Sequence, residues 1–223
     1  MNFTTPGKYT ALTPEIYNYT IRHQSHTHDP LLNALRQETK AFGEISRMLI
    51  SEEQGSFFTL LVAALGVRSA IEIGTFTGGS AICIARGLSE KGRLICCDIN
   101  EVWTAIAKKY WAEAGVDHKI ELRLGPAAET LQKFPSHEIF DFAFIDADKT
   151  GYDTYFELLF PRLKPNGIMI FDNMLWGGKL ENGQTSNADG QAIHHLNEKL
   201  STDSRIESVL LPIADGLMMC RKK

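Results

Sequence analysis

The chain has 223 residues, with 23 Lys and Arg against 27 Asp and Glu, a net charge of −4, and 43% hydrophobic residues. These values are typical of one globular domain and exclude collagen-like, low-complexity and strongly basic chains. The apolar runs are too short to span a bilayer, the first residues lack a secretory pattern, and the four cysteines form no C-x-x-C pair. We therefore expect a cytoplasmic protein that binds neither membranes nor nucleic acids.

The N-terminal part of the chain predicts helices. Three helices are expected, at residues 14–22, 30–42 and 55–65. The first two are joined by a connector that contains three histidines, His23, His26 and His28. We interpret these histidines as solvent-exposed rather than as a metal site, because no carboxylate accompanies them. Residues 1–45 are expected to form a helical segment of a single domain whose α/β core covers residues 46–223.

Strands and helices then alternate along the chain. Strands are predicted at residues 70–74, 93–98, 120–124, 140–146 and 168–172, with helices between them at 80–88, 101–114, 126–134 and 152–160. This alternation indicates a Rossmann-like, doubly wound α/β fold with helices on both faces of a parallel sheet. A last helix at 191–200 precedes strands at 206–212 and 217–221, which the turn around Asp215 joins into an antiparallel hairpin.

Acidic residues stand where the predicted strands end. Asp98, Asp146 and Asp172 each close a strand, and Glu72 lies near the end of the first one. The carboxyl ends of parallel strands share one edge of the sheet, where ligands bind in doubly wound folds. Any one aspartate could instead be the N-cap of the next helix. Four together favour a ligand site, because crowded carboxylates repel one another unless donors or a cation offset them. Asp141 begins its strand, so we expect it at the opposite edge, without a role.

The turn after the first strand is rich in glycine and has the spacing G-x-x-x-G-G over residues 74–79. This differs from the G-x-G-x-x-G pattern of NAD sites. Because Asp98 at the next strand end can accept both hydroxyls of a ribose, the turn and the acid together predict an adenosine pocket.

The later acids predict a metal site. Asp146, Asp172 and Asn173 supply hard oxygen ligands, which suit Mg²⁺, Ca²⁺ or Mn²⁺ rather than zinc. Lys149 follows closely and could act as a base beside the metal, although a surface lysine is the alternative. Trp103 is predicted in the core or at a dimer face, and Trp176 in the wall of a substrate pocket.

Several stretches resemble the cation-dependent O-methyltransferases that use S-adenosylmethionine, the family of caffeoyl-CoA and catechol O-methyltransferases. They resemble its small bacterial type more than the vertebrate catechol enzyme. They are MLISEEQGSF (48–57), AIEIGTFTGGS (70–80), CDIN (97–100), AGVDHKIELRLGPA (114–127), FDFAFIDADKTGY (140–152), GIMIFDNMLWGG (167–178) and LPIADGLMMCRK (211–222). The resemblance implies a seven-stranded, mostly parallel sheet and a homodimer. It also implies methyl transfer to a vicinal diphenol, such as a catechol, a flavonoid-like compound or a hydroxycinnamoyl-CoA.

The resemblance assigns roles to individual residues. Residues implied to contact S-adenosylmethionine are Ile50, Glu72, Gly74, Thr75, Ser80, Asp98, Ala127 and Asp148. Residues implied to bind the divalent cation are Asp146, Asp172 and Asn173, with Lys149 and Asp146 in catalysis. One position departs from the plant enzymes, since Gly177 follows Trp176 where they carry an Asn that contacts substrate. The alternatives are an NAD(P)-dependent oxidoreductase and a non-catalytic protein that binds an adenosine ligand.

Overall fold

The computed structural model describes residues 10–25, 29–180 and 187–223, so His26, His28 and the middle of loop 177–190 lie outside it. The helices are α1 (Pro14–Arg22), α2 (Pro30–Thr39), α3 (Glu52–Ala64), α4 (Gly79–Gly87), α5 (Glu101–Glu113), α6 (Ala127–Lys133), α7 (Tyr152–Leu159) and α8 (Ala188–Thr202). Short 3₁₀ segments lie at Lys40–Met48, Asp117–Lys119, Lys149–Gly151, Phe160–Arg162 and Trp176–Gly178. None of these described helices is long and apolar enough to cross a membrane.

Within the described chain, seven strands form one sheet in the order β3-β2-β1-β4-β5-β7-β6. They are β1 (Ser69–Ile73), β2 (Arg93–Asp98), β3 (Ile120–Leu124), β4 (Phe140–Ile145), β5 (Leu163–Phe171), β6 (Ile206–Leu211) and β7 (Leu217–Lys222). The strands from β3 to β5 pair in parallel, whereas β7 is antiparallel to both β5 and β6. The predicted fold class, including the antiparallel C-terminal hairpin, is confirmed.

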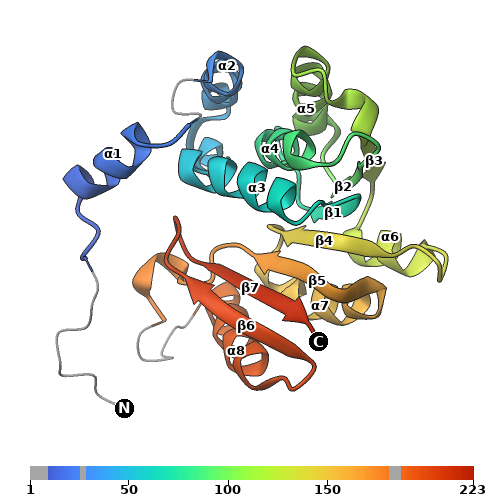
Figure 1. The fold of residues 1–223 in the computed structure, drawn as a ribbon. Coiled ribbons are helices and arrows are strands. Elements are labelled where there is room, and N and C mark those ends of the chain that lie inside the picture. Colours follow the sequence, from blue (N-terminus) through green and yellow to red (C-terminus); the bar gives the residue numbers. More distant parts are fainter. Residues whose placement is uncertain (1–9, 26–28, 181–186) are drawn as a thin grey trace.

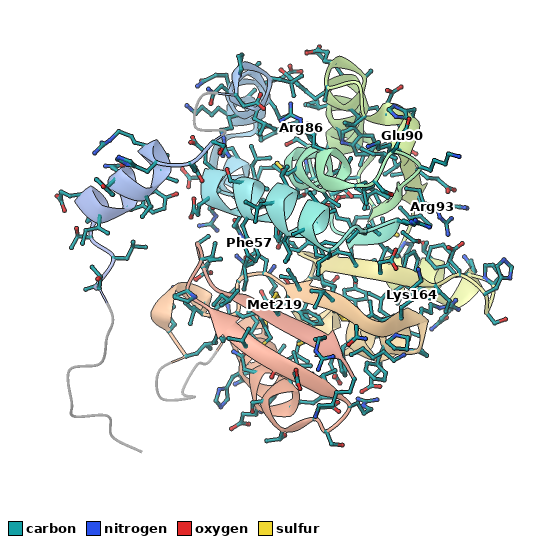
Figure 2. All side chains as sticks on the ribbon, viewed as in Figure 1. Phe57, Arg86, Glu90, Arg93, Lys164 and Met219 are labelled. Atoms are coloured by element: carbon teal, nitrogen blue, oxygen red, sulfur yellow. The ribbon has the colours of Figure 1, made fainter. Side chains whose placement is uncertain are left out.

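Helices cover both faces of the sheet: α3, α4 and α5 lie on one side, and α6, α7 and α8 on the other (Figure 1). Alternate strand residues serve the two faces, as the two-residue period of a strand requires. Thus Ala70 of β1 packs under α3 and α4, and Ile71 packs toward α7. Figure 2 labels Phe57 on α3 and Met219 on β7. Both pack against the hydrophobic core that contains Ala70, on the face of the sheet covered by α3 and α4.

Four predicted boundaries were wrong by three residues or more. Helix α3 begins at Glu52 rather than at 55, because the capping box of Ser51 and Gln54 starts it there. Residues 40–42 do not continue α2 but belong to the 3₁₀ segment Lys40–Met48, which Gly43 interrupts with a φ of 66°. Strand β5 begins at Leu163 rather than at 168, and its early part includes Asn166 with a φ of 64°. Helix α8 begins at Ala188 rather than at 191, because the side chain of Asn187 caps its first N–H groups.

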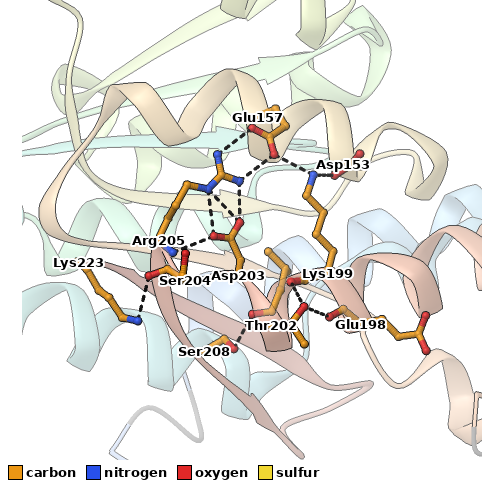
Figure 3. A network of polar contacts seen from close by, with 11 residues as sticks. Asp153, Glu157, Glu198, Lys199, Thr202, Asp203, Ser204, Arg205, Ser208 and Lys223 are labelled. Atoms are coloured by element: carbon orange, nitrogen blue, oxygen red, sulfur yellow. Dashed lines mark hydrogen bonds and ion pairs between the residues drawn. The ribbon is translucent and has the colours of Figure 1, made fainter.

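A network of charged side chains fastens α7 to α8 and to the turn before β6 (Figure 3). Arg205 donates to Glu157 at 2.9 Å and to Asp203 at 3.0 Å, and Lys199 lies 2.8 Å from Glu157. The guanidinium also stacks 4.5 Å from the ring centroid of Phe160. Helix α7, which this network holds, follows directly on the segment Lys149–Gly151.

Candidate active site

A cleft of about 1130 Å³ opens where β1, β2, β4 and β5 end. Asp98, Asp146 and Asp172 all line it, which confirms that the acids closing three strands converge. Asp141 lies at the other edge of the sheet as predicted, accepting hydrogen bonds from the main-chain N–H of Ser69 at 2.9 Å and from Lys164 at 2.6 Å. Of the residues assigned to the site from the sequence, all but Glu72 line the cleft: Ile50, Gly74, Thr75, Ser80, Asp98, Ala127, Asp146, Asp148, Lys149, Asp172 and Asn173.

The glycine-rich turn is held closed by Asp98. One carboxylate oxygen accepts the main-chain N–H of Thr75 at 2.9 Å and that of Phe76 at 2.8 Å, and the other accepts the N–H of Asn100 at 2.8 Å. Gly74 is required here, because a Cβ atom would lie 2.0 Å from the carbonyl oxygen of Asp146. The alternative that Asp98 only caps a helix is wrong, since the Asn100 side chain caps α5. The remaining lone pairs of Asp98 can accept ligand hydroxyls.

Glu72 is fully buried in β1 and does not line the cleft. Its carboxyl group lies near the hydroxyls of Ser80 and Thr75, yet within the described residues neither of its oxygens has a hydrogen bond of good geometry. Burial, with a smaller contribution from the charge of Asp146, raises the pKa of Glu72 to about 7. A buried carboxyl group without a partner is costly and fits a cationic ligand group, such as an ammonium.

Lys149 is not a surface lysine, since its side chain is only 12% exposed. Its ammonium group donates to Asp146 Oδ1 at 2.8 Å and to the hydroxyl of Tyr152 at 2.7 Å, and it lies 4.8 Å from the centroid of the Tyr152 ring. The Tyr152 hydroxyl in turn donates to the carbonyl oxygen of Asp172 at 3.2 Å. Tyr152, which the sequence analysis missed, thus connects the lysine to the neighbouring strand end.

Asp172 is buried at the end of β5, with 4% of its surface exposed. One of its oxygens accepts the main-chain N–H of Asn173 at 2.7 Å, and the other accepts the side-chain amide of Gln54 at 2.9 Å. Burial and the nearby charge of Asp146 raise the pKa of Asp172 to about 7. The carboxylates of Asp146 and Asp172 repel each other, and Asn173, the next residue along the chain, also lines the cleft. Two carboxylates and an amide are a donor set that suits a hard divalent cation. Among the described residues, no group of three or more His, Cys, Asp or Glu side chains is arranged to hold a metal ion, so this candidate set depends on two carboxylates and an amide.

Aromatic rings form one wall of the cleft. Trp103 lines it and packs edge-on against Phe76, with ring centroids 5.0 Å apart, so its predicted place in the core was wrong. Trp111, eight residues further along α5, is buried, and its indole N–H donates to the carbonyl oxygen of Gly78 at 3.3 Å. Trp176 lines the cleft, as predicted.

Gln54 and Tyr155 also line the cleft and were missed. Tyr155 donates its hydroxyl to Asp148, one of the predicted cofactor residues. Gln54 closes a capping box with Ser51 at the start of α3, and the pattern S-x-x-Q was the signal that could have drawn attention to it.

The O-methyltransferase family profile matches residues 22–223 of this chain. Among curated relatives, probable caffeoyl-CoA O-methyltransferase 1 of Dictyostelium discoideum is 40% identical over 100% of this chain and 99% of its own length. Caffeoyl-CoA O-methyltransferase of Petroselinum crispum is 31% identical over 93% and 90% of the two chains. Among solved structures, the O-methyltransferase from Bacillus cereus in complex with SAH has a TM-score of 0.82 at 30% identity, covering 93% of this chain and 96% of that one.

Proposed function

Because the chain belongs to the O-methyltransferase family, we propose that it transfers the methyl group of S-adenosylmethionine to one hydroxyl of a vicinal diphenol, beside a bound divalent cation. The observation that carries the proposal is the convergence of Asp98, Asp146, Lys149 and Asp172 on one cleft. Membership of this family favours methyl transfer over the two alternatives, an NAD(P)-dependent oxidoreductase and a non-catalytic adenosine-binding protein.

The methyl donor fits the part of the cleft formed by β1 and β2. Asp98 would accept the ribose hydroxyls, and Trp103 and Ala127 offer apolar surface for the adenine. The carboxyl group of Glu72, buried beside Thr75 and Ser80, would attract the amino group of the methionine part through its charge. Ile50, Gly74 and Asp148 complete this half of the cleft. The sulfonium, when bound, supplies an electrophilic methyl group.

The cation fits between Asp146 and Asp172, with Asn173 as the third ligand from the chain. Its charge would offset both the burial of Asp172 and the repulsion from Asp146, which together raise the pKa of Asp172. A hard cation chelated by two adjacent hydroxyls lowers the pKa of the one that reacts. The donor set favours Mg²⁺, with Mn²⁺ and Ca²⁺ as alternatives.

Lys149 is placed to receive the acceptor's proton. Its Nζ donates to Asp146 Oδ1 and to the Tyr152 hydroxyl, and these two contacts hold the nitrogen at the cleft. A cation bound by Asp146 would engage that carboxylate, and Lys149 in its amine form, still held by Tyr152, would then take the proton of the acceptor hydroxyl. The edge of the sheet would hold the methyl donor and the acceptor side by side, and this proximity would lower the barrier to methyl transfer.

We further propose that the protein acts in the cytoplasm as a homodimer on small phenolic acceptors. Gly177 has no side chain to contact an acceptor, which favours small catechols and flavonoid-like compounds over hydroxycinnamoyl-CoA.

A methyl-transfer screen tests this function. The purified protein is incubated with labelled S-adenosylmethionine and catechols, flavonoids or hydroxycinnamoyl thioesters, with Mg²⁺ or with EDTA. We expect transfer to a vicinal diphenol that EDTA abolishes and Mg²⁺ restores. Full activity in EDTA would show that the cation assignment is wrong, and transfer only to monophenols would refute the acceptor class.

A further inference from the structure

Gln54 joins two parts of the cleft that are far apart in the sequence. It lies in the first turn of α3, is only 2% exposed, and donates from its side-chain amide to Asp172 Oδ2 across 118 residues of sequence. Its carbonyl oxygen accepts the main-chain N–H of Ser51 at 2.9 Å. The buried Gln54 side chain therefore caps the start of α3 and also contacts a candidate metal ligand.

The capping box fixes which end of the amide faces Asp172. Because the Gln54 carbonyl oxygen is used by the Ser51 N–H, the NH₂ group must point the other way, toward the carboxylate. Asp172 therefore receives two N–H donors, one on each oxygen, from Gln54 and from Asn173. Two donors on different oxygens hold the plane of a carboxylate, whereas one donor leaves it free to rotate about its Cβ–Cγ bond.

We propose that Gln54 is a positioning residue that holds the Asp172 carboxylate in the orientation in which it binds the divalent cation. This inference rests on the proposed function, because it needs Asp172 to be a metal ligand. Partners that orient a ligating group from outside the metal shell typically change metal affinity by about 10- to 100-fold. Gln54 is neutral and does not compete with the cation for charge, so it can hold the carboxylate without blocking its remaining lone pairs.

The test measures metal and cofactor binding separately. Mn²⁺ serves as the probe, with free Mn²⁺ followed by electron paramagnetic resonance, and S-adenosylhomocysteine binding is measured by calorimetry in EDTA. For Gln54→Met we expect Mn²⁺ affinity to fall about 10-fold or more, while S-adenosylhomocysteine affinity in EDTA changes by less than about twofold. Gln54→Asn, whose amide is one methylene shorter and cannot span both partners, is expected to weaken Mn²⁺ binding likewise and serves if Gln54→Met does not fold.

Two controls separate positioning from helix stability. Ser51→Ala removes the hydroxyl that caps α3 but keeps the main-chain N–H that orients Gln54. Tyr17→Phe removes the hydrogen bond to Glu53. Glu53 is next to Gln54 in the sequence, but its side chain faces a different direction on the helix. Both control variants are expected to bind Mn²⁺ like the wild type at temperatures well below their melting transitions.

Each outcome is decisive. Normal Mn²⁺ affinity in the Gln54 variants, with a wild type that binds Mn²⁺, overturns the positioning role and leaves the proposed function intact. Equal losses in Mn²⁺ and S-adenosylhomocysteine affinity, matched by Ser51→Ala, would reduce Gln54 to a structural cap. A wild type that does not bind Mn²⁺ overturns the cation assignment itself.

Discussion

Replacing Glu72 by Gln tests the electrostatics of the cofactor half of the cleft. The pKa of this buried carboxyl group is raised from an ordinary value of 4.5 to about 7. The folded protein therefore keeps a proton that the unfolded chain has lost, so its free energy of unfolding falls as pH rises from about 4.5 to 7. Each pKa unit corresponds to about 1.4 kcal/mol, so the loss is about 3 kcal/mol above pH 7.

Glu72→Gln has no charge to bury and should avoid this loss. We expect the variant and the wild type to be about equally stable at pH 4.5, and the variant to be about 3 kcal/mol more stable at pH 8. Urea unfolding at intervals across that range measures the difference. In the same variant, S-adenosylhomocysteine should bind at least about 10-fold more weakly at pH 8, because its amino group loses a charged acceptor.

At pH 8 the variant should gain stability and lose affinity for S-adenosylhomocysteine. A variant whose fold is merely damaged would lose both, so the two explanations can be distinguished. Parallel stability curves for variant and wild type would refute the reasoning. Asp141→Asn is the matched control at the other edge of the sheet. There the raising effect of burial is outweighed by hydrogen bonds from Lys164 and two main-chain N–H groups, so the pKa of Asp141 is lowered. Its stabilising contribution is present above the ordinary pKa and is lost in acid, so this variant should be less stable at pH 8.

Three other changes test the rest of the site and its support. Asp172→Ala should lose Mn²⁺ binding and turnover together, as measured by calorimetry and methyl transfer. Lys149→Met should lower kcat about 100-fold or more with little change in the KM for S-adenosylmethionine, while Lys133→Met, at an exposed ion pair, should behave like the wild type. Arg205→Ala should lower stability by about 1 kcal/mol near neutral pH. Hydrogen bonds from Arg205 and Lys199 lower the pKa of Glu157 to about 2, so this loss should disappear as pH falls from 4.5 toward 2 in thermal melts.

The sequence was informative wherever a local pattern determines structure. The predicted bounds of β2 and β3 match the structure, because β2 is an apolar run, β3 alternates apolar and charged residues, and a glycine stands beside each of them. The convergence of Asp98, Asp146 and Asp172 followed from parallel topology alone. Helix periodicity could place Trp103 on a face of α5 but could not tell that this face borders a cleft.

Other features depend on contacts that no local pattern contains. The hydrogen bond from Gln54 to Asp172 spans 118 residues. Glu72 was expected to line the pocket, yet its position on β1 places it beneath the glycine-rich turn's side chains rather than at the surface of the cleft. Strand periodicity gives only the face of the sheet, not how deep in the layer a side chain ends.

The acids at this edge of the sheet differ in the hydrogen bonds and charge compensation that the protein gives them. This difference explains how one edge can accommodate different ligands. Asp98 already accepts three main-chain N–H groups, so the lone pairs it has left suit neutral donors, such as hydroxyls. Glu72 has no hydrogen bond of good geometry among the described residues, so it favours a ligand group that brings its own positive charge. Asp146 and Asp172 share a repulsion that the ammonium of Lys149 only partly offsets, and the doubly charged ion proposed above would relieve it. Each ligand therefore has one place in the cleft where its charge is needed.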